Sequence, residues 1–336
     1  MTKKQDGALL VLDASTIAAA LSPADWLDMA EQALRGTSDG SVHQGVRQIL
    51  PLPGEEQRGR VLSMMFGAVA YPACFGAKVI SVFPDNFHRG LDSHRGAVLL
   101  FDPEDGALVA LFHGGEITAR RTAAASAIAT KILARADATI LTVLGYGEQA
   151  AQHVDAIALV RPLAEIRCWG RDGAKARAFA ASVAERHAVR AVAADTIEQA
   201  VAGSDILCTA TSAKTPILSG DLLEPGMHLN VVGSSTADYR EVDNAAVARS
   251  SLWVDFRQMT EVSAGEYLQA VADGAISPSH IVGEVGAILT GAVRGRQDDR
   301  EITMFKSLGM AAEDLYAAHL VYRRALERGL GSSVAL

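Results

Sequence analysis

The stretch Thr139-Ile140-Leu141-Thr142-Val143-Leu144-Gly145-Tyr146-Gly147-Glu148-Gln149-Ala150 places a short apolar run directly before a G-x-G-x-x-A motif. The two glycines permit a tight turn from a strand into a helix and a close approach of the backbone to a pyrophosphate. The helix that follows directs its N–H groups and the positive end of its dipole at that anion. Gly145, Tyr146 and Gly147 are therefore candidate cofactor-binding residues.

The sequence after this turn alternates between helical and strand-like segments, which is the context that the motif requires. Helical apolar spacing occurs over residues 148–159 and 174–186. Strand-like apolar runs occur at residues 165–169, 191–193, 205–209, 228–232 and 252–254. This alternation is typical of a doubly wound parallel sheet that binds ligands at the carboxyl ends of its strands. We predict a Rossmann dinucleotide-binding domain over residues 121–304.

The first 115 residues have a different pattern. Strand-like stretches are separated by turn signals such as Pro53-Gly54 and 102–106, which predicts a mostly antiparallel sheet. A long amphipathic helix over residues 309–328 is expected to return to this first domain. The predicted fold is therefore α/β, with a Rossmann-type sheet inserted into an α+β domain made of residues 1–120 and 305–336.

Composition excludes several classes of function. The chain has 336 residues and a formal net charge of -8, and it lacks a long Lys/Arg block, so we expect no nucleic-acid or membrane partner. No run approaches the about 18 apolar residues of a membrane span, and the first apolar stretch is too short for a signal peptide. Three cysteines without a C-x-x-C pair, and histidines without ligand spacing, predict a cytoplasmic protein with no metal site.

One arginine lies where a core residue is expected. On a helix starting at Glu116, Arg121 shares an apolar stripe with Ala125, Ile128 and Ile132. A buried guanidinium is costly unless an anion pairs with it. Arg121 is therefore a candidate for binding an anionic ligand, and the alternative is that it pairs with an internal carboxylate.

Two further cations lie in strand-like apolar surroundings, Arg47 and Lys78. The guanidinium group suits bidentate binding of a carboxylate, and a desolvated lysine loses its proton easily enough to act as an acid or base. Taken singly, each of these cations is more often an exposed charge on an edge strand. Together with Arg121 they predict a pocket for an amino-acid-like carboxylate, and His88 and His94 are either pocket residues or surface loop residues.

The residues after the second strand of the Rossmann unit bear on the choice of cofactor. Gly170-Arg171-Asp172 occupies the place where an acidic residue would bind a ribose 2'-hydroxyl group. Arg171 suits the 2'-phosphate of NADP, so NADP(H) is favoured, while Asp172 leaves NAD(H) open. Thr211 and Ser234 end two later strands and are placed to contact nicotinamide and ribose, although small hydroxyl residues also end strands for local hydrogen bonding.

Over nearly its whole length the chain resembles the ornithine cyclodeaminase and mu-crystallin family. The resemblance rests on residues 116–126, 144–150, 224–234 and 305–309. It implies a homodimer in which the N-terminal sheet and the C-terminal helix, residues 1–120 and 305–336, form the substrate-binding and dimerisation domain. It also implies that Arg47, Lys78 and Arg121 match the family's substrate-contacting cations. Five further residues match positions that line the cofactor and substrate cleft: Ser93, Glu148, Gln149, Thr211 and Ser307.

One departure from the family pattern limits the reaction. Ser235 stands where an aspartate acts in catalysis in ornithine cyclodeaminases, which makes deaminative cyclisation doubtful. The expected activity is NAD(P)H-dependent reduction of a C=N bond next to a carboxylate, in a cyclic ketimine such as pyrroline-2-carboxylate or piperideine-2-carboxylate. Alternatives are an amino-acid dehydrogenase resembling alanine dehydrogenase, an ornithine cyclodeaminase, or a non-enzymatic binding protein resembling mu-crystallin.

Overall fold

The computed structural model describes residues 8–54 and 59–335, and the side chains of Phe87 and His88 lie outside this description. The chain forms two compact units, one of residues 1–121 with 310–336 and one of residues 122–309. The first boundary falls inside helix α3 (Gly114–Leu133). The second lies after strand β15 (Thr303–Lys306) rather than at residue 305, because β15 pairs within the sheet of the second unit.

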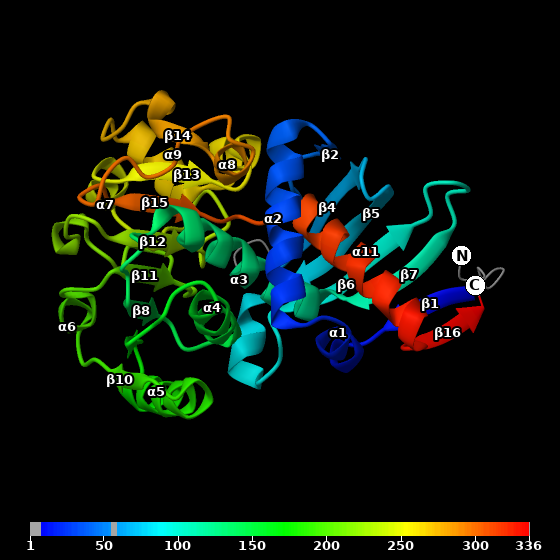
Figure 1. Ribbon diagram of the computed structural model, residues 1–336, viewed down its shortest axis with the longest axis horizontal. Helices are drawn as coiled ribbons and strands as arrows, with labels where there is room; N and C mark the ends of the chain where they lie inside the picture. The colour runs from blue at the N-terminus through cyan, green and yellow to red at the C-terminus, as the bar shows by residue number, and fades with distance from the viewer. Residues whose placement is uncertain (1–7, 55–58, 336) are drawn as a thin grey trace. The chain divides into compact units, whose positions relative to one another are not determined.

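The second unit is built on an eight-stranded parallel sheet in the order β10-β9-β8-β11-β12-β15-β13-β14 (Figure 1). Its other strands are β8 (Ile140–Leu144), β9 (Glu165–Trp169), β10 (Arg190–Ala193), β11 (Ile206–Thr209), β12 (His228–Val231), β13 (Ser251–Val254) and β14 (Ile281–Glu284). The strand order reverses between β8 and β11, and sheets of this type bind ligands at the carboxyl ends next to such a reversal. The doubly wound sheet predicted from the sequence is confirmed.

The helices of the second unit cover a sheet whose central strands are buried throughout. Every residue of β11, β12 and β15 is buried, as expected for strands covered on both faces. The helices are α4 (Glu148–Ala158), α5 (Gly173–His187), α6 (Ile197–Val201), α7 (Asn244–Ala248), α8 (Arg257–Ser263), α9 (Gly265–Ala272) and α10 (Val285–Leu289), with 3₁₀ turns η3 (Gly220–Leu222) and η4 (Pro278–His280). Val143, Val154 and Ile166 belong to the core beneath them.

The first unit has a mostly antiparallel sheet in the order β16-β1-β7-β6-β5-β4-β2, with β3 paired to β4. Its strands are β1 (Ala8–Leu12), β2 (Val42–Gln44), β3 (Gln48–Pro51), β4 (Val61–Val69), β5 (Cys74–Val82), β6 (His94–Phe101), β7 (Leu108–His113) and β16 (Ser332–Ala335). Only β1 and β7 pair in parallel among the described strands of this sheet. This agrees with the antiparallel domain expected from the sequence.

Two long helices pack together in the first unit, α2 (Pro23–Asp39) and α11 (Ala311–Arg328), and α11 also packs on β4, β5 and β6 (Figure 1). A capping box between Ser22 and Asp25, with Pro23 at the first helical position, starts α2. The unit is completed by α1 (Ala14–Ala20) and the 3₁₀ turn η2 (Pro84–Arg89). Within the described residues, no helix combines the length and apolar character needed to cross a membrane.

Candidate active site

A buried cluster of ion pairs in the first unit contains two of the predicted cations. Lys78 Nζ on β5 lies 3.0 Å from Oδ1 and 2.8 Å from Oδ2 of Asp314 on α11. Arg121 on α3 donates from Nε to Asp314 Oδ1 at 3.2 Å and from Nη1 to Glu313 Oε2 at 2.5 Å. All four side chains are at most 3% exposed. The internal pairing that the sequence left open for Arg121 is therefore present.

Local structure explains why these charges meet. Lys78 lies on the inward side of β5, where Gly76 and Ile80 are also buried. Glu313 and Asp314 occupy the first turn of α11, where the helix dipole stabilises carboxylates. Buried ions are tolerated when each has an opposite partner, so the cluster is a stable way to hold two cations inside the unit.

Arg47 and His94 belong to the same electrostatic neighbourhood. Arg47 is half-buried in the connection between β2 and β3, and its charge lowers the pKa values of both Lys78 and His94. Ser93 Oγ lies 2.8 Å from His94 Nδ1 at the start of β6. The structure thus gathers Arg47, Lys78, Arg121 and His94 in one region of the first unit, with Ser93 beside them.

The environment of Lys78 makes its charge variable. Burial lowers the pKa of Lys78 to about 8, the positive charges of Arg121 and Arg47 act in the same direction, and Asp314 opposes them. Both protonation states are therefore populated slightly above neutral pH. With Lys78 protonated, the positive charges of this region can attract an added anion.

His94 is held in its neutral form. Burial lowers its pKa to about 4, and the positive charges of Lys78 and Arg47 contribute in the same direction. Burial is the largest cause of this shift, and the two cations add to it. A neutral imidazole next to the cations leaves their charge available for an anion.

The glycine turn in the second unit has the geometry of a dinucleotide cradle. Gly145 follows β8 with a φ of 130°, and a Cβ there would lie 2.5 Å from the carbonyl oxygen of Ala210. Gly147 is the exposed N-cap of α4, which has no side-chain cap, and a Cβ there would meet no atom within 4 Å. The turn therefore presents open backbone at a helix N-terminus, which fits a pyrophosphate.

The end of β9 carries the residues that the sequence places near the adenosine ribose, Gly170, Arg171 and Asp172. The ring of Tyr146 lies against Gly170, where a Cβ would lie 2.3 Å from two ring carbons. Asp172 Oδ1 accepts hydrogen bonds from Ala174 N at 3.0 Å and Lys175 N at 3.1 Å, so this carboxylate caps α5. Arg171 is exposed and, within the described residues, its guanidinium has no hydrogen bond or ion pair.

The remaining predicted residues of the second unit lie at the carboxyl edge of its sheet. The Thr211 hydroxyl group donates to Glu241 at 2.7 Å and accepts from Ala213 N at 3.1 Å, and the Ser234 hydroxyl group donates to the Tyr239 carbonyl. Both hydroxyl groups therefore make hydrogen bonds within the protein, which is the local role that the sequence left open for them. Glu148 and Gln149 open α4, and Ser307 is buried after β15 with no hydrogen bond at its Oγ within the described part of the chain.

Sequence reasoning missed three buried acidic residues that organise these sites, Glu313 and Asp314 in the first unit and Glu241 in the second. The first two follow Gly309 in an otherwise apolar stretch, and carboxylates at buried helical positions are rare unless paired. Two acidic residues in such an apolar stretch are therefore a signal that they form ion pairs with buried cations such as Lys78 and Arg121.

A doubly wound parallel sheet with an open glycine turn is typical of an enzyme that binds a dinucleotide cofactor. The model of the Ornithine cyclodeaminase/mu-crystallin family matches residues 9–329, and the chain belongs to this family. The resemblance found in the sequence is therefore confirmed.

Three relatives place the chain within the family. It is 38% identical over 284 residues to the ketimine reductase mu-crystallin of Mus musculus, covering 84% of this chain and 86% of that protein. The structure of Thermococcus litoralis Delta(1)-pyrroline-2-carboxylate reductase with NADH and L-proline aligns with a TM-score of 0.94 at 33% identity, over 97% of this chain and 100% of that one. An archaeal alanine dehydrogenase dimer with bound NAD aligns with a TM-score of 0.91 at 26% identity, over 97% and 99%.

Proposed function

We propose that the protein reduces a C=N bond adjacent to a carboxylate, with a cyclic ketimine such as pyrroline-2-carboxylate or piperideine-2-carboxylate as substrate and an amino acid as product. The observation that carries this proposal is Lys78, which is buried beside Arg121 and has a pKa of about 8. A lysine in this state can give a proton to an imine nitrogen near neutral pH. The two reductases among the relatives support the same chemistry.

The charged residues divide among three roles in this mechanism. Arg47 and Arg121 bind the substrate carboxylate and fix the orientation of the ring. Lys78 keeps the imine nitrogen protonated, so that the adjacent carbon is electrophilic. When bound, the reduced nicotinamide supplies the hydride that this carbon accepts. Glu313 and Asp314 hold Arg121 and Lys78 in place through the ion pairs at 2.5 to 3.2 Å.

An amino-acid dehydrogenase is the second candidate, favoured by the alanine dehydrogenase relative. Absorbance of the reduced cofactor separates the candidates directly. We expect oxidation of NADPH with pyrroline-2-carboxylate or piperideine-2-carboxylate, and little with pyruvate plus ammonium. Faster oxidation with pyruvate plus ammonium would favour the dehydrogenase. Formation of proline from ornithine without net cofactor change would favour a cyclodeaminase.

We further propose NADPH rather than NADH as the cofactor. Arg171 at the end of β9 is exposed and available for a 2'-phosphate, while the cap formed by Asp172 occupies the nearest carboxylate. Replacing Gly170 by an acidic residue would bring its Cβ against the Tyr146 ring. The end of β9 therefore suits a phosphate better than a ribose hydroxyl group.

Arg171→Ala is expected to weaken NADPH binding and leave NADH binding nearly unchanged. Loss of one charge-assisted hydrogen bond corresponds to about 1.5–3 kcal/mol, or roughly a tenfold to hundredfold rise in Kd. Fluorescence titration with each cofactor measures this. Arg186→Ala, at the last turn of α5, is the matched control. An equal loss of affinity for both cofactors in Arg171→Ala would contradict the assignment.

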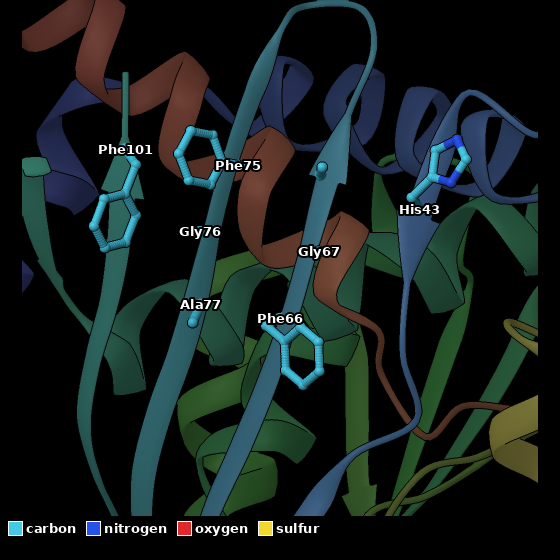
Figure 2. A pocket seen from close by; sticks show the side chains of 8 residues that line it. His43, Phe66, Gly67, Phe75, Gly76, Ala77 and Phe101 are labelled. Carbon is cyan, nitrogen blue, oxygen red and sulfur yellow. The ribbon is translucent and has the colours of Figure 1, made fainter. Parts of the chain in front are cut away.

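The sheet of the first unit also supports a homodimer. Its outward face carries Leu62, Met64 and Phe66 of β4, each 38–42% exposed, and Phe75 of β5 at 37%. Figure 2 shows the hollow on this face, where the Phe75 and Phe101 rings stack with centroids 5.3 Å apart. A contiguous apolar face of this kind is typical of a protein interface, and the alanine dehydrogenase relative is a dimer. The occupant that we propose is a second copy of the chain.

Phe66→Asp is expected to convert the dimer to a monomer, because two buried carboxylates would oppose association across the twofold interface. Sedimentation velocity gives the mass of each species. Val262→Asp introduces the same charge at an exposed apolar residue of α8, which is 55% exposed, and should leave the mass unchanged. A Phe66→Asp protein that kept the dimer mass would show that another surface forms the interface.

A further inference from the structure

Glu241 is a fully buried carboxylate that joins two of the loops at the carboxyl edge of the parallel sheet. Its Oε1 accepts hydrogen bonds from the backbone N and the Oγ1 of Thr211, both at 2.7 Å. Its Oε2 accepts from Thr209 Oγ1 and from Gly233 N, also at 2.7 Å. One side chain therefore binds the segments that follow β11 and β12.

The backbones that Glu241 joins are packed without space for side chains. A Cβ on Gly233 would lie 2.2 Å from Thr211 O and 2.5 Å from Glu241 Oε1. A Cβ on Gly145 would lie 2.5 Å from Ala210 O. The glycine turn thus rests on the segment after β11, which in turn rests on Gly233. The ends of β8, β11 and β12 form one contiguous block with Glu241 as its bridge.

The same block extends to β15 through a second buried acidic residue. Glu266 Oε1 accepts from Glu241 N at 3.1 Å, and its Oε2 lies 3.0 Å from Lys306 Nζ. Lys306 Nζ also donates to Ser234 O at 2.6 Å. Lys306 ends the strand that precedes Ser307, so a second predicted cofactor contact is connected to the same network.

Only an acceptor-only group satisfies the position of Glu241. Two backbone N–H groups and two hydroxyl groups point at its oxygens, and a carboxylate accepts all four. Burial raises the pKa of Glu241, while the threonine donors and the charge of Lys306 lower it. A glutamine of the same shape would turn its amide N–H groups toward one of the backbone N–H groups. A buried carboxylate therefore fits this position, whereas the neutral amide would place two N–H donors against each other.

We propose that Glu241 is a positioning residue for the nicotinamide end of the bound cofactor, because it fixes the spacing between the backbones of Thr211 and Gly233. This inference rests on one part of the proposed function, which is that the dinucleotide binds at these strand ends. Glu241 is buried beneath the edge and contacts no ligand itself. It acts by holding the loops in the geometry that binding requires, so the cofactor does not have to order them.

Glu241→Gln tests this proposal without any imine substrate. We expect the Kd for NADPH, measured by its fluorescence well below the melting temperature, to rise at least about tenfold. In turnover assays the KM for NADPH should rise more than the KM for the ketimine. Asp243→Asn is the matched control, since Asp243 lies two residues along and caps α7 by accepting from Ala246 N at 2.8 Å. Asparagine keeps an oxygen that can accept these helix-capping hydrogen bonds, so this variant should leave both the melting temperature and the Kd nearly unchanged.

Thr209→Val provides a milder second variant if Glu241→Gln does not fold. It removes one donor from beneath the edge, preserves the side-chain shape at a residue that is 1% exposed, and should raise the Kd several-fold. A purely structural role would lower the melting temperature of these variants with an unchanged NADPH Kd, and that result would overturn the proposal. A wild-type protein that binds no NADPH would instead reject the proposed cofactor.

Discussion

Replacing Arg121 by alanine is expected to lower kcat/KM for ketimine reduction by roughly 30-fold to several thousand-fold. The loss corresponds to the about 2–5 kcal/mol that truncating one partner of a buried charge pair costs. Arg121 is 3% exposed, and its ion pairs with Glu313 and Asp314 fix the orientation of the guanidinium group. Steady-state kinetics with NADPH and pyrroline-2-carboxylate measure the effect, and the Kd for NADPH should change little.

Stability has to be measured in the same experiment. Removing Arg121 leaves two buried carboxylates with one cation fewer, which is expected to lower the free energy of unfolding by about 3–5 kcal/mol. Arg121→Lys keeps the charge and loses the bidentate geometry, so it should remain folded and still lose most of the activity. Arg120→Ala is the control, because that half-buried neighbour pairs only with Glu116 among the ion pairs of α3 within the described residues. Equal losses of activity and NADPH binding in Arg121→Lys would indicate a structural role.

Lys78→Met is expected to lower kcat by about a hundredfold or more, since general acid catalysis contributes roughly 10²–10⁴-fold. Methionine preserves much of the side-chain volume, and Asp314 keeps Arg121 as its partner. The pH profile gives a sharper test. The pKa of Lys78 is lowered to about 8, so its protonated fraction falls as the pH rises through this value. Wild-type kcat should therefore fall above about pH 8, and the variant should lack this fall.

A binding role for Lys78 gives a different result. If the ammonium group only binds the carboxylate, Lys78→Met would raise the KM for the ketimine while kcat at saturation stayed close to that of the wild type. The proton would then come from the imine as it exists in solution. Comparison of the two kinetic constants in the same variant separates these roles.

Much of the fold follows from patterns that the chain displays locally. The run before Gly145 and the alternating segments after it predicted β8, β9, β11 and the helices between them. Strands β14 and β15 were not predicted, because short apolar runs of four residues cannot be told from buried helix segments by periodicity. Missing β15 moved the expected second boundary to residue 305.

The N-terminal elements were missed for related reasons. The apolar run of β1 is too short to be assigned by itself, and its role as a strand depends on pairing with β7 and β16, which are far away in the sequence. The start of helix α2 is marked by its capping box, a local signal that was overlooked. Pairing partners distant in sequence are set by tertiary contacts rather than by local propensity.

The sequence singled out the two cations that the structure buries, Lys78 and Arg121, but not the carboxylates that pair with them. Arg121 stood out because it lies on an apolar helical stripe, and Lys78 stood out because it lies in an apolar strand-like stretch. Glu313 and Asp314 escaped notice because acidic residues near a helix start are ordinary on the surface. Glu241 lies in a segment without regular structure, where no periodicity marks a residue as buried.

A crystal structure with NADPH and the substrate analogue pyrrole-2-carboxylate tests the central claim most directly. We predict that the carboxylate of the analogue lies within hydrogen-bonding distance of Arg47 and Arg121, with Lys78 Nζ next to the ring nitrogen or the carboxylate. This prediction would be contradicted by an analogue bound away from these side chains, with Arg121 and Lys78 still enclosed by Glu313 and Asp314 and out of its reach.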